Sequence, residues 1–155
     1  MRATKLFVTT CVAIVLVAAA STSQSYAQVR GDVRVGFFTN GSNASLGAGI
    51  IGRIAPNLYL NPMIEYVFVS GATSLFMSGD GHYDFQLRDD DAHVWLGGGV
   101  GVQYVSVNDF SETNVGLDLL TGIAFASHAS VYPYFQLKGF FSKTTTAQLA
   151  VGLRF

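Results

Sequence analysis

The chain has little of what many catalytic and metal sites are built from. Its 155 residues include one cysteine, Cys11, and three prolines, and only 12% of them are charged. A single cysteine excludes an internal disulfide, and its place in an early apolar segment leaves the rest of the chain without a thiol nucleophile or a thiolate metal ligand. No long stretch repeats apolar residues with the helical period. Abundant glycine, phenylalanine and tyrosine favour strands instead.

The first 27 residues have the features of a cleaved export signal. Two basic residues precede an apolar run from Leu6 to Ala20, and the tripeptide Ser25-Tyr26-Ala27 offers a cleavage site with small residues at both ends. A transmembrane anchor is the alternative, but the run is short of the roughly 20 residues that a spanning helix needs. We therefore predict a signal peptide at 1–27 and one domain at 28–155.

The charge of the predicted domain is slightly negative. Removing the signal leaves seven basic and ten acidic residues, because Arg2 and Lys5 belong to the signal. A domain with this balance has no basic surface of the kind that binds nucleic acid, so we expect no nucleic-acid partner.

From Gln28 onward, apolar residues recur at every second position, which is the period of a β-strand. Eight such segments follow one another, each about as long as the 9–11 residues of a tilted membrane strand or somewhat longer. Turn-forming residues separate them. The expected strands are Val29–Thr39, Ala44–Ile54, Leu58–Val69, Ser74–Leu87, His93–Val105, Val115–Ala126, Val131–Phe141 and Thr146–Phe155.

Each predicted strand keeps its charges on one face, and the other face carries none. In a soluble sandwich or lipocalin, the apolar face points inward and charges coat the outside. Eight strands enclose an interior just wide enough for side chains, and the charge-free face is too extensive for it. We therefore expect apolar side chains toward lipid and charges in the lumen. The predicted lumen charge network comprises Arg34, Arg53, Glu65, Asp80, His82, Asp84, Asp118, Lys138 and Arg154.

Glycines on the inward faces of the second, fifth and sixth segments are expected to leave room for large side chains arriving from across the lumen. The run Gly97-Gly98-Gly99 could instead form a phosphate loop. It lacks the following helix and the Lys-Ser/Thr pair that such a loop needs. We interpret these glycines as packing positions.

The last ten residues, TAQLAVGLRF, end a strand on an aromatic side chain. This ending, together with HYDF at 82–85 and VWLGGGVGV at 94–102, resembles the small bacterial outer-membrane β-barrel proteins related to the OmpA transmembrane domain, OmpX and the opacity proteins. The resemblance covers 28–155. It implies an all-β fold, an eight-stranded antiparallel up-and-down transmembrane β-barrel, integral to the cell outer membrane with both termini in the periplasm.

The resemblance also implies the partners of the chain. These are the outer-membrane lipid bilayer and, during biogenesis, the outer-membrane assembly machinery and periplasmic chaperones; the barrel itself is expected to be a monomer. A terminal phenylalanine belongs to the signal that the machinery recognises in this group. The residues expected to form that assembly signal are Tyr134, Leu149, Val151, Leu153 and Phe155.

Strand parity divides the expected connections between two sides. Those facing outside the cell would be Asn40-Gly41, Ser70–Thr73, Ser106–Asn114 and Ser142–Thr145, and those facing the periplasm Ala55–Asn57, Arg88–Ala92 and Ser127–Ser130. The predicted outward loops are short. Relatives that act as adhesins, invasins or antigens usually carry long loops or protruding strands, so these roles are disfavoured, and we expect the last strand to pair with the first.

Three groups of residues could carry chemistry but have a simpler interpretation. His82 between Asp80 and Asp84 could supply metal ligands or an acid–base pair, yet charges in a narrow lumen must be paired, which favours ion pairs with lumen cations. His128-Ala129-Ser130 resembles part of the lipid A deacylase site, but parity puts it on the periplasmic side and the Asn-rich sequence that follows it there is absent. The acids at 89–91 are consecutive, unlike the ligands of a calcium loop.

We therefore predict a non-enzymatic integral outer-membrane protein with a side-chain-filled lumen, no catalytic residues and no cofactor or metal. Its role would be structural or at the surface of the cell envelope. A narrow pore for ions or very small solutes, a lipid-modifying enzyme and a soluble secreted ligand-binding barrel are the alternatives, because a fold alone does not fix a function.

Overall fold

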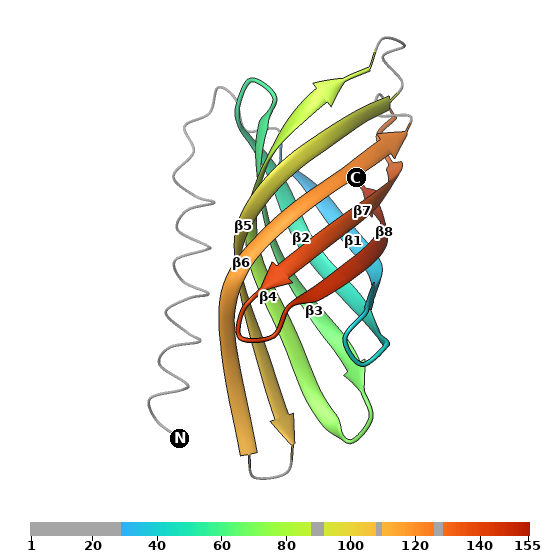
Figure 1. Cartoon of the computed structure of the whole chain (residues 1–155). Helices are drawn as coiled ribbons and strands as arrows, with labels where there is room; N and C mark the ends of the chain where they lie inside the picture. Colours follow the sequence, from blue (N-terminus) through green and yellow to red (C-terminus); the bar gives the residue numbers. More distant parts are fainter. Residues whose placement is uncertain (1–28, 88–91, 108–109, 126–128) are drawn as a thin grey trace.

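The computed structural model describes residues 29–87, 92–107, 110–125 and 129–155. They form eight antiparallel strands that close into a barrel in chain order (Figure 1). The predicted all-β, eight-stranded up-and-down barrel is therefore confirmed. The predicted signal peptide at 1–27 lies outside the described residues and stays a prediction. The strands are β1 Val29–Phe38, β2 Asn43–Ala55, β3 Leu58–Val69, β4 Ala72–Gln86, β5 Ala92–Val107, β6 Phe110–Phe125, β7 Tyr132–Phe141 and β8 Thr146–Arg154.

The barrel closes where β8 pairs antiparallel with β1, as the sequence predicts. Val35 lies opposite Val151 in this pair, and the register continues without a shift from Asp32 to Phe38. The chain end completes the junction: the Gly31 N–H donates to the Phe155 carbonyl at 2.7 Å, and the Phe155 N–H donates back at 3.0 Å. No sheet edge is left open at this junction, which is what closure into a barrel achieves.

Side chains alternate between the outer wall and the lumen along every strand. In β8, Leu149 is 57% exposed whereas its neighbour Gln148 is 1% exposed. The outer wall consists of aliphatic, aromatic and small side chains, and none of the described strand residues facing outward is charged. Among the described residues, no helix has the length and hydrophobicity needed to cross a bilayer.

One predicted loop is wrong. Residues Ser106–Asn114 were expected to connect two strands, but β5 continues to Val107 and β6 begins at Phe110. The two strands pair without interruption from Val107–Phe110 to Ala92–Phe125. The polar residues in this stretch indicate a strand with two water-accessible faces, because threonine and valine both favour extended backbone. The other predicted strand ends agree to within two residues.

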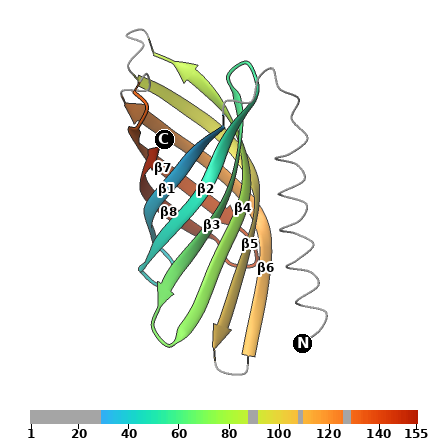
Figure 2. The ribbon, with the colours of Figure 1, turned by 180° about the vertical axis from the view of Figure 1, so that it is seen from behind.

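The connections lie at two ends of the barrel, which the two views in Figures 1 and 2 agree on. The end with the C-terminus, here the terminal end, also has the β2–β3 connection, where Asn57 adopts a left-handed φ of 60°. The opposite end, the far end, has the β1–β2, β3–β4, β5–β6 and β7–β8 connections. Its rim is uneven, because the β5–β6 hairpin reaches well past the β7–β8 turn (Figure 1). The predicted absence of protruding strands is therefore also wrong.

A proline lies inside β3 without breaking the barrel. Pro62 cannot donate to β2, and the ladder there passes from the Gly49–Met63 pair to the Gly52–Leu60 pair. The amide nitrogen of Asn61 donates to the Ile50 carbonyl at 2.7 Å. This side chain supplies a donor where the proline has none, so a backbone carbonyl in the wall stays hydrogen-bonded.

Candidate functional site in the barrel lumen

The middle of the lumen is crossed by an ion pair between non-neighbouring strands. Arg34 of β1 donates from Nη2 to the Glu65 carboxylate of β3, and both side chains are fully buried. Glu65 also accepts hydrogen bonds from Gln148 Nε2 at 2.6 Å and from Ser45 Oγ at 3.1 Å. Because β8, β1, β2 and β3 all contribute to this group, one carboxylate joins four strands through the interior.

A second group connects β7 with β4 and β6. The Lys138 Nζ lies 2.5 Å from Asp80 Oδ2 and donates to Ser78 Oγ at 2.9 Å. Asp118 of β6 lies 3.9 Å from the same nitrogen. Two carboxylates therefore share one buried ammonium group, and the strands that carry them approach each other across the lumen rather than along the sheet.

A third group lies toward the terminal end, beside the junction of β1 and β8. Arg154 donates from Nε to Asp32 Oδ2 at 3.2 Å, and the Tyr134 hydroxyl donates to the other oxygen of that carboxylate. The guanidinium carbon of Arg154 is 4.5 Å from the Trp95 ring centroid and 4.7 Å from that of Tyr134. The cation is therefore held by one carboxylate and two aromatic faces, which suits a planar guanidinium.

Two histidines flank a single carboxylate between β4 and β5. His82 Nε2 lies 3.4 Å from Asp84 Oδ1, and His93 Nε2 lies 3.3 Å from Asp84 Oδ2. The Tyr59 ring stacks on His82 with centroids 5.7 Å apart. The histidines approach different oxygens from opposite sides, so they do not converge on one point. No cluster of three or more histidine, cysteine or acidic residues suited to a metal ion occurs in the part of the chain that the structure describes.

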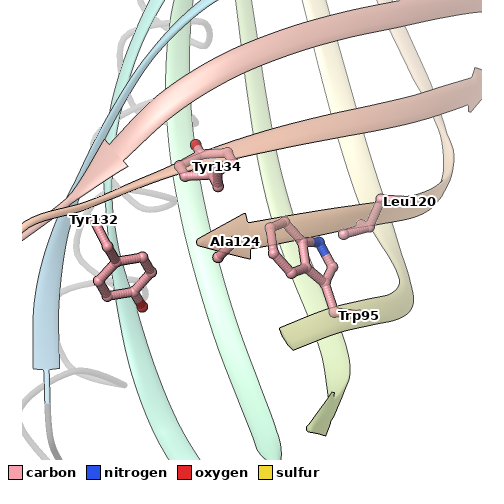
Figure 3. Close-up of a cluster of buried hydrophobic side chains, with 5 residues drawn as sticks. All are labelled: Trp95, Leu120, Ala124, Tyr132 and Tyr134. Atoms are coloured by element: carbon pink, nitrogen blue, oxygen red, sulfur yellow. The ribbon is translucent and has the colours of Figure 1, made fainter. Parts of the chain in front are cut away.

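Aromatic clusters close the lumen on both sides of the ion pairs. Toward the terminal end, the buried cluster consists of Trp95, Leu120, Ala124, Tyr132 and Tyr134, whose side chains gather around the interior of the barrel (Figure 3). Toward the far end, the second cluster consists of Phe38, Val67, Phe76 and Phe140. The ring of Phe76 packs edge-on against both Phe38 and Phe140, with centroids 5.7 and 5.1 Å away.

The inward residues of β7 run through these layers in order. Tyr132 and Tyr134 belong to the cluster at the terminal end, Gln136 and Lys138 to the polar middle, and Phe140 to the cluster at the far end. All five are buried. The lumen is therefore filled by side chains from one end of the strand to the other, as expected for an interior enclosed by eight strands.

Inward glycines provide the space for these side chains. A Cβ at position 101 would lie 2.8 Å from the Phe76 ring and 3.0 Å from both Phe140 and the Asp118 carboxylate. A Cβ at Gly47 would lie 2.6 Å from the Glu65 side chain. These close approaches agree with the packing role that the sequence predicts for inward glycines.

The structure places the predicted lumen charges in different surroundings. All but one are buried and lie within ion-pair distance of an opposite charge or, for His82, of Asp84. The exception is Arg53, which is half-buried and donates to the carbonyl of Ala55 at 3.4 Å, outside these groups. Sequence reasoning omitted Asp32 and His93, although strand parity puts both on the inward face.

The remaining candidate residues lie at the edges of the described structure. Ser130 is exposed between β6 and β7, whereas His128 lies outside the described residues, as do the acids at 89–91. In the predicted assembly signal, Leu149, Val151, Leu153 and Phe155 share the outer wall, and Tyr134 points into the lumen. The two parts of that signal therefore lie on opposite faces of the folded barrel.

Several solved structures share this architecture. The N-terminal β-barrel domain of Pseudomonas aeruginosa OprF has a TM-score of 0.67 at 14% identity, covering 82% of this chain and 96% of that domain. Neisserial surface protein A (NspA) has a TM-score of 0.64 at 18% identity, covering 81% of this chain and 94% of its own. A de novo designed transmembrane β-barrel also has a TM-score of 0.64, at 13% identity, covering 86% and 98%.

The predicted resemblance to small outer-membrane barrels is thus confirmed at the level of the fold. No protein-family model matches the sequence, and no curated protein matches it. At these identities the likeness concerns the fold alone. The designed barrel illustrates this, because its fold was specified without an inherited biological role.

Proposed function

We propose that this chain is an integral outer-membrane protein with a closed lumen, which contributes to the structure or the surface properties of the cell envelope. The observation that carries the proposal is the separation of the outer wall from the lumen. Large apolar side chains are exposed on all eight strands, whereas the buried charges lie inside. An uncharged outer wall is stable in hydrocarbon, and a closed barrel leaves no strand edge there to be satisfied.

The orientation follows from the two ends of the barrel. Both ends of the barrel domain lie at the terminal end, which we assign to the periplasm, and the uneven far end then faces outside. The solved structures that resemble this chain include outer-membrane proteins, which supports the location. In this orientation, the protruding β5–β6 hairpin would be the part of the chain that extends farthest from the cell.

The closed lumen is supported by the side chains that cross it. Ion pairs tie β1 to β3 and β7 to β4, and an aromatic cluster lies on either side of them. A steady water path past these layers would have to separate buried charges that are now paired, which is costly. We infer that the folded barrel does not conduct ions.

Single-channel recording in a planar bilayer tests this proposal. The purified protein should insert, as judged by heat-modifiable gel migration, without producing steady conductance. Glu65→Gln removes the charge that joins four strands and provides the comparison. A steady open state in the wild-type protein that Glu65→Gln abolishes would contradict the closed lumen and favour the narrow pore.

Assembly gives a separate test of the outer-membrane location. We propose that the exposed Phe155 ring takes part in recognition before it completes the junction with Gly31. Phe155→Asp should lower the amount of protein recovered in the outer membrane, whereas Phe135→Leu, at an outer-wall position that is equally exposed, should leave it nearly unchanged. An outer-membrane yield of Phe155→Asp equal to wild type would contradict this role.

A further inference from the structure

The wall of the barrel ends at different heights on the two sides of β6. Along one edge, β6 pairs with β5 over its whole length, from Phe110 to Phe125. Along the other edge, its pairing with β7 begins only at Leu117, opposite Phe141. Among the described residues, the segment Ser111–Val115 therefore has a strand partner on one side and none on the other. We call this segment the free edge.

The free edge lies beyond the apolar part of the outer wall. Going along β6 toward the far end, the outward residues change from Leu119, Leu117 and Val115 to Thr113 and Ser111. Thr113 and Ser111 are both exposed. The backbone groups of this segment are thus outside the proposed hydrocarbon region, where they are accessible to another protein.

The free edge lacks the features that usually protect a strand edge from pairing. Natural edges are blocked by lysine, proline, a bulge or a covering loop. Here the segment SETNV contains neither lysine nor proline, and its register with β5 has no shift. Its single charge is Glu112. A regular edge of this kind can add another strand by backbone hydrogen bonding.

Parity and charge select one register for pairing with an identical segment. Two copies related by a two-fold axis keep the same sheet face on the same side, so each residue must lie opposite one of equal parity. A register centred on Glu112 would place two carboxylates directly opposite each other, which is unfavourable. A register centred on Thr113 places Glu112 opposite Asn114 and Thr113 opposite its own copy, and paired threonines are favourable in sheets.

The same symmetry fixes where the two barrels lie. Antiparallel pairing reverses the strand direction, and in each copy β6 runs from the protruding tip toward the terminal end. The two barrels would therefore lie at opposite ends of the shared sheet. This arrangement requires the copies to be in two membranes that face each other, and it leaves the barrel monomeric within each membrane.

We propose that the free edge of β6 pairs antiparallel with the free edge of a second copy and so joins two facing membranes. The proposal rests on the proposed membrane insertion, with the far end pointing outward. Five residues span roughly 17 Å at about 3.4 Å per residue. One such contact is small, so many copies acting together on two surfaces provide the stable attachment.

Vesicle aggregation with charge-swapped variants tests the pairing. Wild-type proteoliposomes should aggregate, measured by co-sedimentation of vesicles carrying two different dyes. Thr113→Lys and Thr113→Glu, each on both sets of vesicles, place like charges opposite each other and should lower co-sedimentation several-fold. Mixing Thr113→Lys vesicles with Thr113→Glu vesicles should restore it. The matched controls are Thr144→Lys and Thr144→Glu, at an exposed position of the β7–β8 turn on the same end.

The outcomes separate this proposal from the proposed function. Heat-modifiable migration and protection from protease in the same vesicles report insertion. A chain that does not insert overturns both proposals. Inserted wild-type chains that leave vesicles dispersed overturn the pairing alone, and so does aggregation that the Thr113 variants do not alter. If the Thr144 variants show the same loss and recovery as the Thr113 variants, attraction between charged vesicles explains the effect and the paired register is wrong.

Discussion

Two adjacent leucines of β6 illustrate how differently the outer wall and the lumen constrain the sequence. Leu119 is 61% exposed on the outer wall, whereas Leu120 is 3% exposed inside the cluster that contains Trp95. The outer wall needs apolar character but no particular partner, because lipid can adapt to the shape of a side chain. The lumen requires shape and charge to match across the barrel, because its neighbours are fixed.

The largest expected effect comes from breaking the central ion pair of the lumen. Glu65→Ala leaves Arg34 buried without its carboxylate, which should lower the free energy of unfolding by about 3–5 kcal/mol. The measurement is the urea midpoint of the protein in lipid vesicles. The double variant Arg34→Met/Glu65→Leu removes both charges and should recover most of that loss. A Glu65→Ala midpoint equal to wild type would mean that the pair is hydrated, contrary to a closed lumen.

The two leucines provide a direct comparison of the two environments. Leu120→Ala should cost roughly 2–5 kcal/mol, because it loses the transfer free energy of the side chain and leaves a cavity. Leu119→Ala loses a transfer contribution of about 2 kcal/mol or less and leaves no cavity, since lipid fills the space. Unfolding of both variants in vesicles should therefore rank Leu120→Ala as the less stable one. The reverse order would contradict the assignment of faces.

A smaller effect is expected from two glycines that differ only in the face they occupy. Gly101→Ala would introduce a Cβ against Phe76 and Phe140 and should cost about 1–3 kcal/mol through overpacking. Gly79→Ala places its Cβ on the outer wall, where nothing lies within 4 Å, and should be neutral or slightly stabilising. Thermal or urea unfolding distinguishes them, and equal losses at the two positions would show that backbone flexibility, rather than space, requires these glycines.

The sequence predicts the wall of this barrel better than its interior. Alternation gives the eight strands, the two faces and the pairing of β8 with β1, because these depend on a local period of two. Parity also places Asp32 and His93 on the inner face. It does not give their partners, since strand tilt and stagger determine which inward residues meet. Arg34 and Glu65 therefore could not be paired from their positions in the sequence.

The length of β5 and β6 could not be predicted for a different reason. Ser106–Asn114 is rich in polar residues, and polar residues in a membrane barrel usually indicate a loop. Here the hairpin extends past the neighbouring β7–β8 turn, so both of its faces can be polar while its strands stay paired. Composition reports the surroundings of a strand, and in this region the surroundings are aqueous.

Accessibility of the outer wall tests the central claim most directly. A chain that begins at residue 28 contains no cysteine, so single cysteines can be introduced and spin-labelled at Leu119, Leu137 and Leu149 on the wall, with Thr144 in the turn as the control. In vesicles, the three wall positions should collide frequently with dissolved oxygen and rarely with a water-soluble nickel complex, and Thr144 should show the opposite. Wall positions as accessible to nickel as Thr144 would contradict a barrel whose charge-free face lies in lipid.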